Sequence, residues 1–94
     1  MKYKILIFII TYKASFRVMD VIKKIPLKYL KQHNYHIYVS DDCSNDDTVT
    51  YIDKIKSKFK KKLTININKK NVGYGANIKN CINFAFKNNI DYAV

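Results

Sequence analysis

The feature that most constrains the fold is a short apolar run, residues 4–10, which is rich in β-branched side chains. Strands that are buried on both faces of a parallel sheet have this composition. The uninterrupted apolar part, residues 5–10, is shorter than the ~7–15 residues of a signal-peptide core and far shorter than the ~20 residues of a membrane span. The run therefore predicts a buried β-strand.

Helical and strand-like patterns then alternate along the chain. A helix is predicted from Phe16, where apolar residues recur at helical spacing until Pro26 interrupts them, and a further turn is expected at residues 27–30. The apolar positions of this helix are Val18, Met19, Ile22 and Ile25. Residues 36–40 predict a second strand, which is followed by an acidic pair.

The next segment repeats this alternation. Ser44 is expected to cap a second helix, with acidic residues in the first turn and lysines crowding the last turn, where cations suit the helix dipole. The acidic residues are Asp46 and Asp47, and the predicted apolar face carries Val49, Ile52, Ile55 and Phe59. Residues 63–67 alternate apolar and polar side chains, which predicts a less buried strand near a sheet edge.

The last third of the chain completes the pattern. A turn at residues 71–75 precedes a third helix, and residues 91–94 have the character of the opening of a fourth strand. The apolar residues of this helix are Ile78, Ile82, Ala85 and Phe86. Strands that alternate with helices imply parallel pairing through right-handed crossovers. We therefore predict the α/β class: a Rossmann-like parallel sheet with flanking helices, in which the fourth strand lies beside the first.

The composition is globular and strongly basic. Apolar residues make up 48% of the chain, and 17 Lys, one Arg and seven acidic residues give a net charge of +11. This charge suits nucleic acid, an anionic membrane surface or a phosphorylated ligand. The excess of Lys over Arg argues against a dedicated nucleic-acid reader, which uses bidentate Arg contacts. A basic nucleic-acid-binding domain is kept as an alternative function.

The two cysteines bear on the cellular compartment. Cys43 and Cys81 form neither a C-x-x-C motif nor a disulfide framework, so we expect free thiols in a reducing compartment. This predicts a cytoplasmic location, which includes a peripheral position at the inner face of the membrane. His33 and His36 lack partners at metal-ligand spacing and predict no metal site.

Three short segments fall at the carboxyl ends of the predicted strands, where open α/β sheets bind their ligands. They are residues 10–12, the pair Asp41 and Asp42, and residues 71–75. An aromatic face stacks on a base, a carboxylate accepts hydrogen bonds from a base N–H or a ribose hydroxyl, and a glycine turn lets backbone approach a ligand. Each feature alone also fits a structural role in packing, in a loop or in a turn. Together they suggest a nucleotide pocket.

Read in order, these segments strongly resemble the N-terminal half of family 2 glycosyltransferases, and the resemblance covers essentially the whole chain. The stretches are IFIITYK at residues 7–13, IYVSDDCSNDDT at residues 37–48 and NVGYGAN at residues 71–77. The Asn-x-Gly-Tyr-Gly form is most like rhamnosyltransferase-type members. The resemblance implies a glycosyltransferase-A fold and the transfer of a sugar from a nucleoside-diphosphate sugar to an acceptor hydroxyl.

The resemblance also implies roles for individual residues. Tyr12 matches the tyrosine that lines the base pocket, with Thr11 beside it, and Asp42 matches the acid that contacts uracil or ribose, supported by Asp41. The Asn-x-Gly turn shapes the nucleotide side of the pocket. The implied nucleotide-binding residues are Thr11, Tyr12, Asp41, Asp42, Asn71, Gly73 and Gly75, with Asn77 as a further candidate.

Some positions depart from the family pattern. Ile10 stands where proline is usual, Lys13 where asparagine is usual, and Cys43 where glycine is common. These positions contribute largely backbone. In the family, an Asp-x-Asp motif after the fourth strand holds a divalent cation, manganese or magnesium, against the diphosphate. Its ligands and the general base are therefore expected beyond Val94.

These implications define the expected protein. Residues 1–94 are predicted to be a single partial nucleotide-sugar-binding domain that ends at the start of the fourth strand and is inactive alone, so no catalytic or metal residue is assigned. The expected partners are a nucleoside-diphosphate sugar and, in the full enzyme of polysaccharide biosynthesis, a saccharide or lipid-linked acceptor. A non-catalytic or partner-completed nucleotide-binding module is the alternative. A short fourth strand would leave one edge of the first strand poorly covered, which favours self-association.

Overall fold

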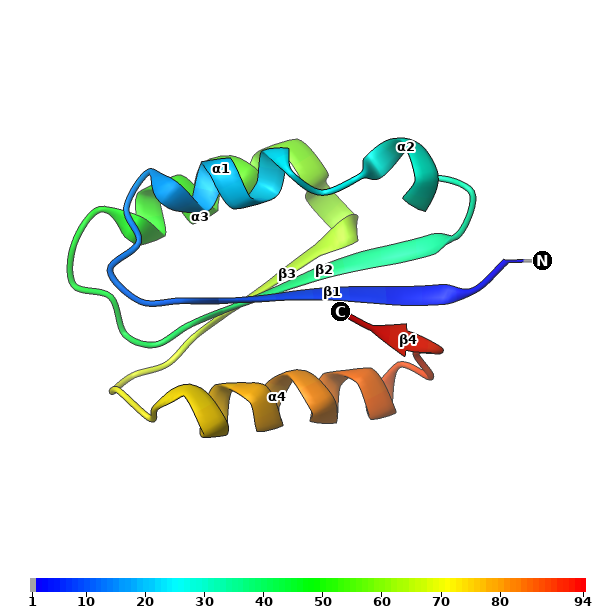
Figure 1. Cartoon of the computed structure of the whole chain (residues 1–94). Helices are drawn as coiled ribbons and strands as arrows, with labels where there is room; N and C mark the ends of the chain where they lie inside the picture. Colours follow the sequence, from blue (N-terminus) through cyan, green and yellow to red (C-terminus); the bar gives the residue numbers. More distant parts are fainter. Residues whose placement is uncertain (1) are drawn as a thin grey trace.

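Four parallel strands form the central sheet in the computed structural model, which describes residues 2–94 (Figure 1). The strands are β1 (Lys4–Thr11), β2 (Asn34–Asp41), β3 (Leu63–Ile67) and β4 (Tyr92–Ala93), and their order is β3-β2-β1-β4. β2 pairs with β1 along its whole length, from Lys4 opposite Asn34 to Thr11 opposite Asp41. The predicted parallel sheet is confirmed, as is the place of the fourth strand beside the first.

Helices cover both faces of this sheet. The helices α1 (Arg17–Lys23), α2 (Leu27–Leu30) and α3 (Thr48–Phe59) lie on one face, and α4 (Tyr74–Lys87) lies on the other (Figure 1). A 3₁₀ turn, η1 (Lys60–Lys62), connects α3 to β3. Within residues 2–94, no helix combines the length and the apolar character that crossing a membrane requires. The α/β class predicted from the sequence is thus confirmed.

Two apolar clusters hold the layers together, because successive side chains of a strand point to opposite faces. The cluster under α1 and α3 consists of the buried residues Ile9, Val18, Ile22, Ile37, Val39, Ile52, Ile55 and Leu63. The cluster under α4 contains Leu6, Tyr38 and Cys81. Each fully buried aliphatic side chain contributes about 1.5–3 kcal/mol to folding. The predicted apolar face of the second helix is confirmed at Ile52 and Ile55, which are both buried in α3.

The predicted helix cap at Ser44 is wrong. The helix α3 begins four residues later, at Thr48, and the Ser44 hydroxyl donates instead to the Asp41 carboxylate at 2.7 Å. The turn before the helix is closed by Asp46, whose carboxylate accepts from the Thr48 N–H at 3.0 Å. A buried carboxylate needs hydrogen-bond donors, and this need takes Ser44 away from the helix.

The third predicted helix is confirmed as α4, but two residues of its apolar set are not in the core. Ile82 is 47% exposed and Phe86 is 81% exposed, whereas Asn77 and Cys81 are buried. The predicted strand at residues 63–67 is confirmed as β3, which lies at a sheet edge and is only partly buried.

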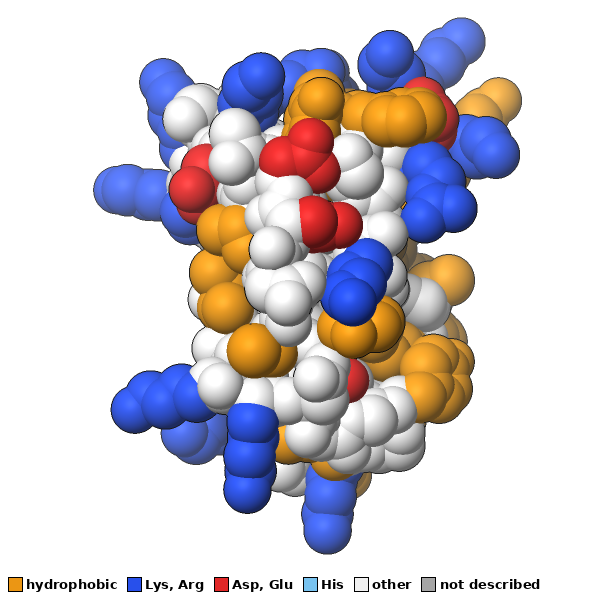
Figure 2. Space-filling model, turned by 90° about the vertical axis from the view of Figure 1, so that its left-hand side faces the viewer, with side chains coloured by type: hydrophobic (Ala, Val, Ile, Leu, Met, Phe, Trp, Pro, Cys, Tyr) orange, Lys and Arg blue, Asp and Glu red, His pale blue; other side chains and the backbone are white. Residues whose placement is uncertain are grey.

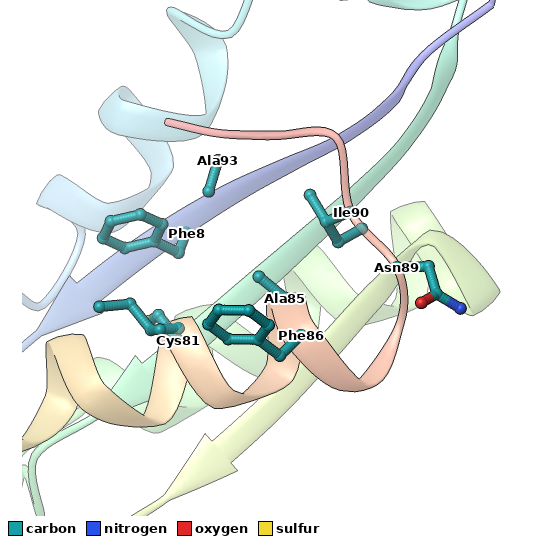
Figure 3. A pocket seen from close by; sticks show the side chains of 8 residues that line it. Phe8, Cys81, Ala85, Phe86, Asn89, Ile90 and Ala93 are labelled. Carbon is teal, nitrogen blue, oxygen red and sulfur yellow. The ribbon is translucent and has the colours of Figure 1, made fainter.

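The other edge of the sheet is only partly covered. β4 pairs with Ile5 and Leu6, and the Phe8 N–H donates to the Val94 carbonyl at 3.0 Å; beyond Phe8 this side of β1 has no strand partner among residues 2–94. Beside it lies an apolar groove of about 440 Å³, lined mainly by Phe8, Cys81, Ala85, Phe86 and Ile90 (Figure 3). The edge that the sequence predicts to be poorly covered is therefore present in the fold.

This edge generates a prediction about association. Replacing Ile82 and Phe86 by serine should weaken concentration-dependent self-association measured by sedimentation velocity, since both apolar side chains flank the uncovered edge. The control is Ile67→Ser on β3, because Ile67 is 46% exposed, much like Ile82, and lies at the opposite edge of the sheet. A chain that stays monomeric at every concentration, with or without these substitutions, contradicts the prediction.

Candidate functional site

The candidate site lies at the edge where the carboxyl ends of β1, β2 and β3 meet. The loops that follow these strands carry Tyr12, Asp42 and Asn71, so the topology brings the three predicted segments together. Figure 2 views this end of the molecule and shows most of the visible acidic side chains in its upper half, with Lys and Arg side chains mainly around the periphery and also near the middle. Ligands of open α/β sheets bind at this edge.

Asp41, the last residue of β2, joins the first two loops. Its side chain is fully buried and accepts hydrogen bonds from the Thr11 hydroxyl at 2.6 Å, the Ser44 hydroxyl at 2.7 Å and the Ser44 N–H at 2.8 Å. The Ser44 hydroxyl in turn accepts from the Lys13 N–H at 2.8 Å. Thr11 and Asp41 therefore position the loops, and neither side chain reaches the surface to touch a ligand.

Asp42 joins the second and third loops. Its carboxylate accepts from the Val72 N–H at 2.7 Å, the Gly73 N–H at 3.1 Å and the Asn68 amide at 3.2 Å. The Asn71 amide also donates to the Asp42 backbone carbonyl at 2.6 Å. With 8% of its surface exposed, Asp42 can present only a small part of its carboxylate to a ligand. Its main effect is to hold the turn of residues 71–73 against the end of β2.

These hydrogen bonds stabilise the ionised form of the Asp42 carboxyl group. The Val72 N–H is the main cause that holds the pKa of this carboxyl below its usual value, and the Gly73 N–H and the Asn68 amide act in the same direction; desolvation opposes them. The carboxylate is therefore ionised at neutral pH. Two backbone N–H groups of the glycine turn are committed to it and are not available to a ligand.

The two glycines of the predicted turn differ. Gly73 has a φ of +88°, a region that favours glycine, and it directly precedes α4. Gly75 lies inside the first turn of α4, and a Cβ at this position would meet no atom within 4 Å. The backbone therefore favours glycine at Gly73. At Gly75, a side chain would extend into open space on the surface of the helix.

A buried polar network supports the turn from below. The Asn77 oxygen accepts from the Ser40 hydroxyl at 2.7 Å and from the Asn68 amide at 2.8 Å, and the Asn77 amide donates to the Gly73 carbonyl at 2.8 Å. Asn77 is fully buried, so it acts as a support and not as a ligand contact. The predicted site residues do not include Ser40, Asn66 or Asn68; the Asn66 amide joins the network by donating to the Ser40 hydroxyl at 3.2 Å. In the sequence, these three positions could be recognised as polar residues at or just after the carboxyl end of a predicted strand.

Tyr12 is the exposed aromatic residue of the site. Half of its surface is accessible, and the Lys13 ammonium lies 5.3 Å from the centroid of its ring. Its ring is therefore available for stacking on a planar group. The apolar groove of Figure 3 is separate from the candidate site at the carboxyl ends of the strands. It contains none of the site residues and no charged side chain.

The described residues do not fit a divalent cation. Within residues 2–94, no group of three or more His, Cys, Asp or Glu side chains is placed to hold a metal ion. The two neighbouring carboxylates at this edge are occupied by donors of their own chain. Hard cations require several free oxygen ligands, which this edge does not offer.

The family profile described as Glycosyl transferase family 2 matches residues 6–90, which is most of the chain. The chain belongs to this family. A search of the curated proteins found no match. Membership implies, in general, a nucleotide-sugar donor and an acceptor, and members of the family commonly use divalent cations.

Two of the positions that depart from the family pattern have a left-handed backbone. Cys43, where family 2 members commonly have glycine, has a φ of +61°, and Lys13, where they usually have asparagine, has a φ of +49°. Both values lie in the left-handed region that glycine and asparagine tolerate best. At these two positions the chain therefore has a left-handed backbone with residues that adopt it less readily than glycine and asparagine.

The environment of Asp42 predicts how stability depends on pH. The pKa of Asp42 is lower in the folded chain than in the unfolded one, so its stabilising contribution is present above the unfolded value of about 3.9 and is lost as the pH falls through the folded value. Asp42→Asn should lower the free energy of unfolding at pH 7 and reduce its decrease between neutral and acid pH. Urea unfolding at both pH values measures this.

The matched control is Asp20→Asn, which makes the same charge change on the exposed side of α1. The interpretation of Asp42 as an anchor is wrong if both variants show the same stability and the same pH dependence.

Proposed function

We propose that this chain is the donor-binding part of a glycosyltransferase that moves a sugar from a nucleoside-diphosphate sugar to an acceptor hydroxyl. The proposed nucleotide edge comprises Thr11, Tyr12, Asp41, Asp42, Asn71, Gly73 and Gly75. In this proposal Tyr12 stacks on the base and the exposed part of Asp42 accepts a hydrogen bond from the base or the ribose. Thr11 and Asp41 position these two residues, and Asn71 and Gly73 form the rim opposite Tyr12.

The observation that carries the proposal is the way in which Asp42 joins the loops of this edge. One carboxylate at the end of a central strand holds the third loop next to the loop that presents an exposed aromatic ring. Hydrogen bonding from two backbone N–H groups fixes this geometry before any ligand arrives, which lowers the cost of ordering on binding. Family membership supplies the class of ligand.

The proposal assigns no chemical step to residues 2–94. The carboxylates at the site are used by the fold, and no metal-ligand set is found in the described part of the chain. We therefore expect this chain to bind the nucleotide without transferring a sugar. Contacts to a base and a ribose alone give weak binding, in the millimolar range of about −4 kcal/mol.

Two finer assignments extend the proposal. The sequence Asn71-Val72-Gly73-Tyr74-Gly75 supports a rhamnosyltransferase-type member that acts in polysaccharide biosynthesis on a saccharide or lipid-linked acceptor. The two free thiols, Cys43 and Cys81, support a cytoplasmic location, with a peripheral position at the inner face of the membrane.

Tyr12→Ala tests the proposed base contact. Stacking of a base on an aromatic side chain contributes ~1–3 kcal/mol, so the substitution should raise the dissociation constant of UDP by at least about fivefold. Calorimetric titration of the wild type and the variant measures this change. Tyr29→Ala is the control, because Tyr29 is also exposed but lies in α2, at the opposite end of the sheet (Figure 1).

If the Tyr12→Ala and Tyr29→Ala variants bind UDP with equal affinity, the base does not stack on Tyr12. No measurable UDP or GDP binding by the wild-type chain would contradict the proposed function itself.

A further inference from the structure

Lys13 is held in a backbone conformation that disfavours lysine. Its φ of +49° lies in the left-handed region, where a residue with a long side chain is uncommon and asparagine is enriched. Asparagine is also the residue that family 2 glycosyltransferases usually have here. The backbone therefore does not explain lysine at this position, and the ammonium group is the feature that distinguishes lysine from asparagine here.

The surrounding hydrogen bonds fix where that group originates. The Lys13 N–H donates to the Ser44 hydroxyl at 2.8 Å, and the Arg17 guanidinium donates to the Lys13 carbonyl at 3.1 Å. Ser44 is itself bound to the buried Asp41 carboxylate. Lys13 is thus connected to the end of β2 by a chain of hydrogen bonds, and its ammonium lies 5.3 Å from the centroid of the Tyr12 ring.

Lys13 is not the only cation at this edge, since the Arg17 guanidinium donates to the Lys13 carbonyl and Lys69 and Lys70 follow β3. Backbone N–H groups of a glycine turn before a helix often bind phosphate, but here those of Val72 and Gly73 donate to Asp42. The described residues also provide no metal-ligand cluster. A nucleoside diphosphate with its base on Tyr12 would bring negative charge to this edge, where the exposed Lys13 side chain starts from the next residue along the chain.

We propose that Lys13 binds the diphosphate of the nucleotide whose base stacks on Tyr12. This inference rests on the proposed function and adds a specific residue for the anionic part of the donor. Because ammonium–phosphate pairing is electrostatic and this side chain is exposed, the contribution is sensitive to ionic strength. A nucleoside without phosphate gains nothing from it.

The chain offers a matched control for the experiment. Lys60, in η1, also has a left-handed backbone, with a φ of +53°, and lies near the start of β3, at the far end of the sheet from the site (Figure 1). Lys13→Asn and Lys60→Asn each lower the net charge of the chain from +11 by one unit. General attraction of anions by this basic chain is therefore equal in both variants.

The experiment titrates uridine and UDP, at low and at moderate salt, into the wild-type 94-residue chain and both variants. Lys13→Asn should weaken UDP binding roughly threefold to tenfold at low salt and less at moderate salt, while uridine binding changes less than about twofold. Lys60→Asn should leave both affinities near those of the wild type. Circular dichroism of each variant verifies that the fold is retained.

The other outcomes overturn the inference in distinguishable ways. If uridine and UDP bind but Lys13→Asn and Lys60→Asn weaken UDP equally, Lys13 has no specific role and the proposed function stands. If Lys13→Asn weakens uridine as much as UDP, the lysine acts on the base through Tyr12 and not on phosphate. If neither ligand binds the wild-type chain, both the inference and the proposed function fail.

Discussion

Two adjacent carboxylates at the end of β2 organise the functional edge of this protein. A buried carboxylate is costly unless donors surround it, and here the donors come from three different loops. Asp41 receives them from Thr11 and Ser44, and Asp42 receives them from the turn of residues 71–73 and from Asn68. The loops after β1, β2 and β3 are therefore connected through one dipeptide. Removing either carboxylate would release loops that are far apart in the sequence.

This arrangement separates support from contact. Thr11, Asp41 and Asn77 are buried and hold the loops, whereas Tyr12 and Lys13 are exposed at the rim. Asp42 lies between the two groups, because most of its hydrogen-bonding capacity serves the glycine turn. A nucleotide at this edge would therefore meet an aromatic ring, an ammonium group and a small part of one carboxylate. In the proposed function, nucleotide binding therefore depends on the positions that Asp41 and Asp42 give to the neighbouring loops.

Most of the fold could be predicted from the sequence, because its signals are local. The apolar run of β1, the alternation of β3 and the spacing of Ile52 and Ile55 each follow from one period of side-chain burial. The errors arose where a side-chain hydrogen bond or an uncovered face overrides the local pattern. Ser44 was expected to cap a helix, but Asp41 binds its hydroxyl, and Ile82 and Phe86 continue an apolar pattern on a face that nothing covers among residues 2–94. The partners within the network of Asn68 and Asn77 could not be predicted, because its bonds join β2, the segment after β3 and α4, which are far apart in the sequence.

The most direct test of this account is a map of amide chemical shifts of the 94-residue chain during titration with UDP. The account predicts dispersed spectra with saturable shifts at Tyr12, Lys13, Asp42 and residues 71–73, and little change along α3 and η1. Shifts spread over the lysines of α3 and η1 that disappear as salt is added would instead indicate general anion binding by a basic surface. That result, or the absence of any shift in a folded chain, would contradict the assignment of this edge as a nucleotide site.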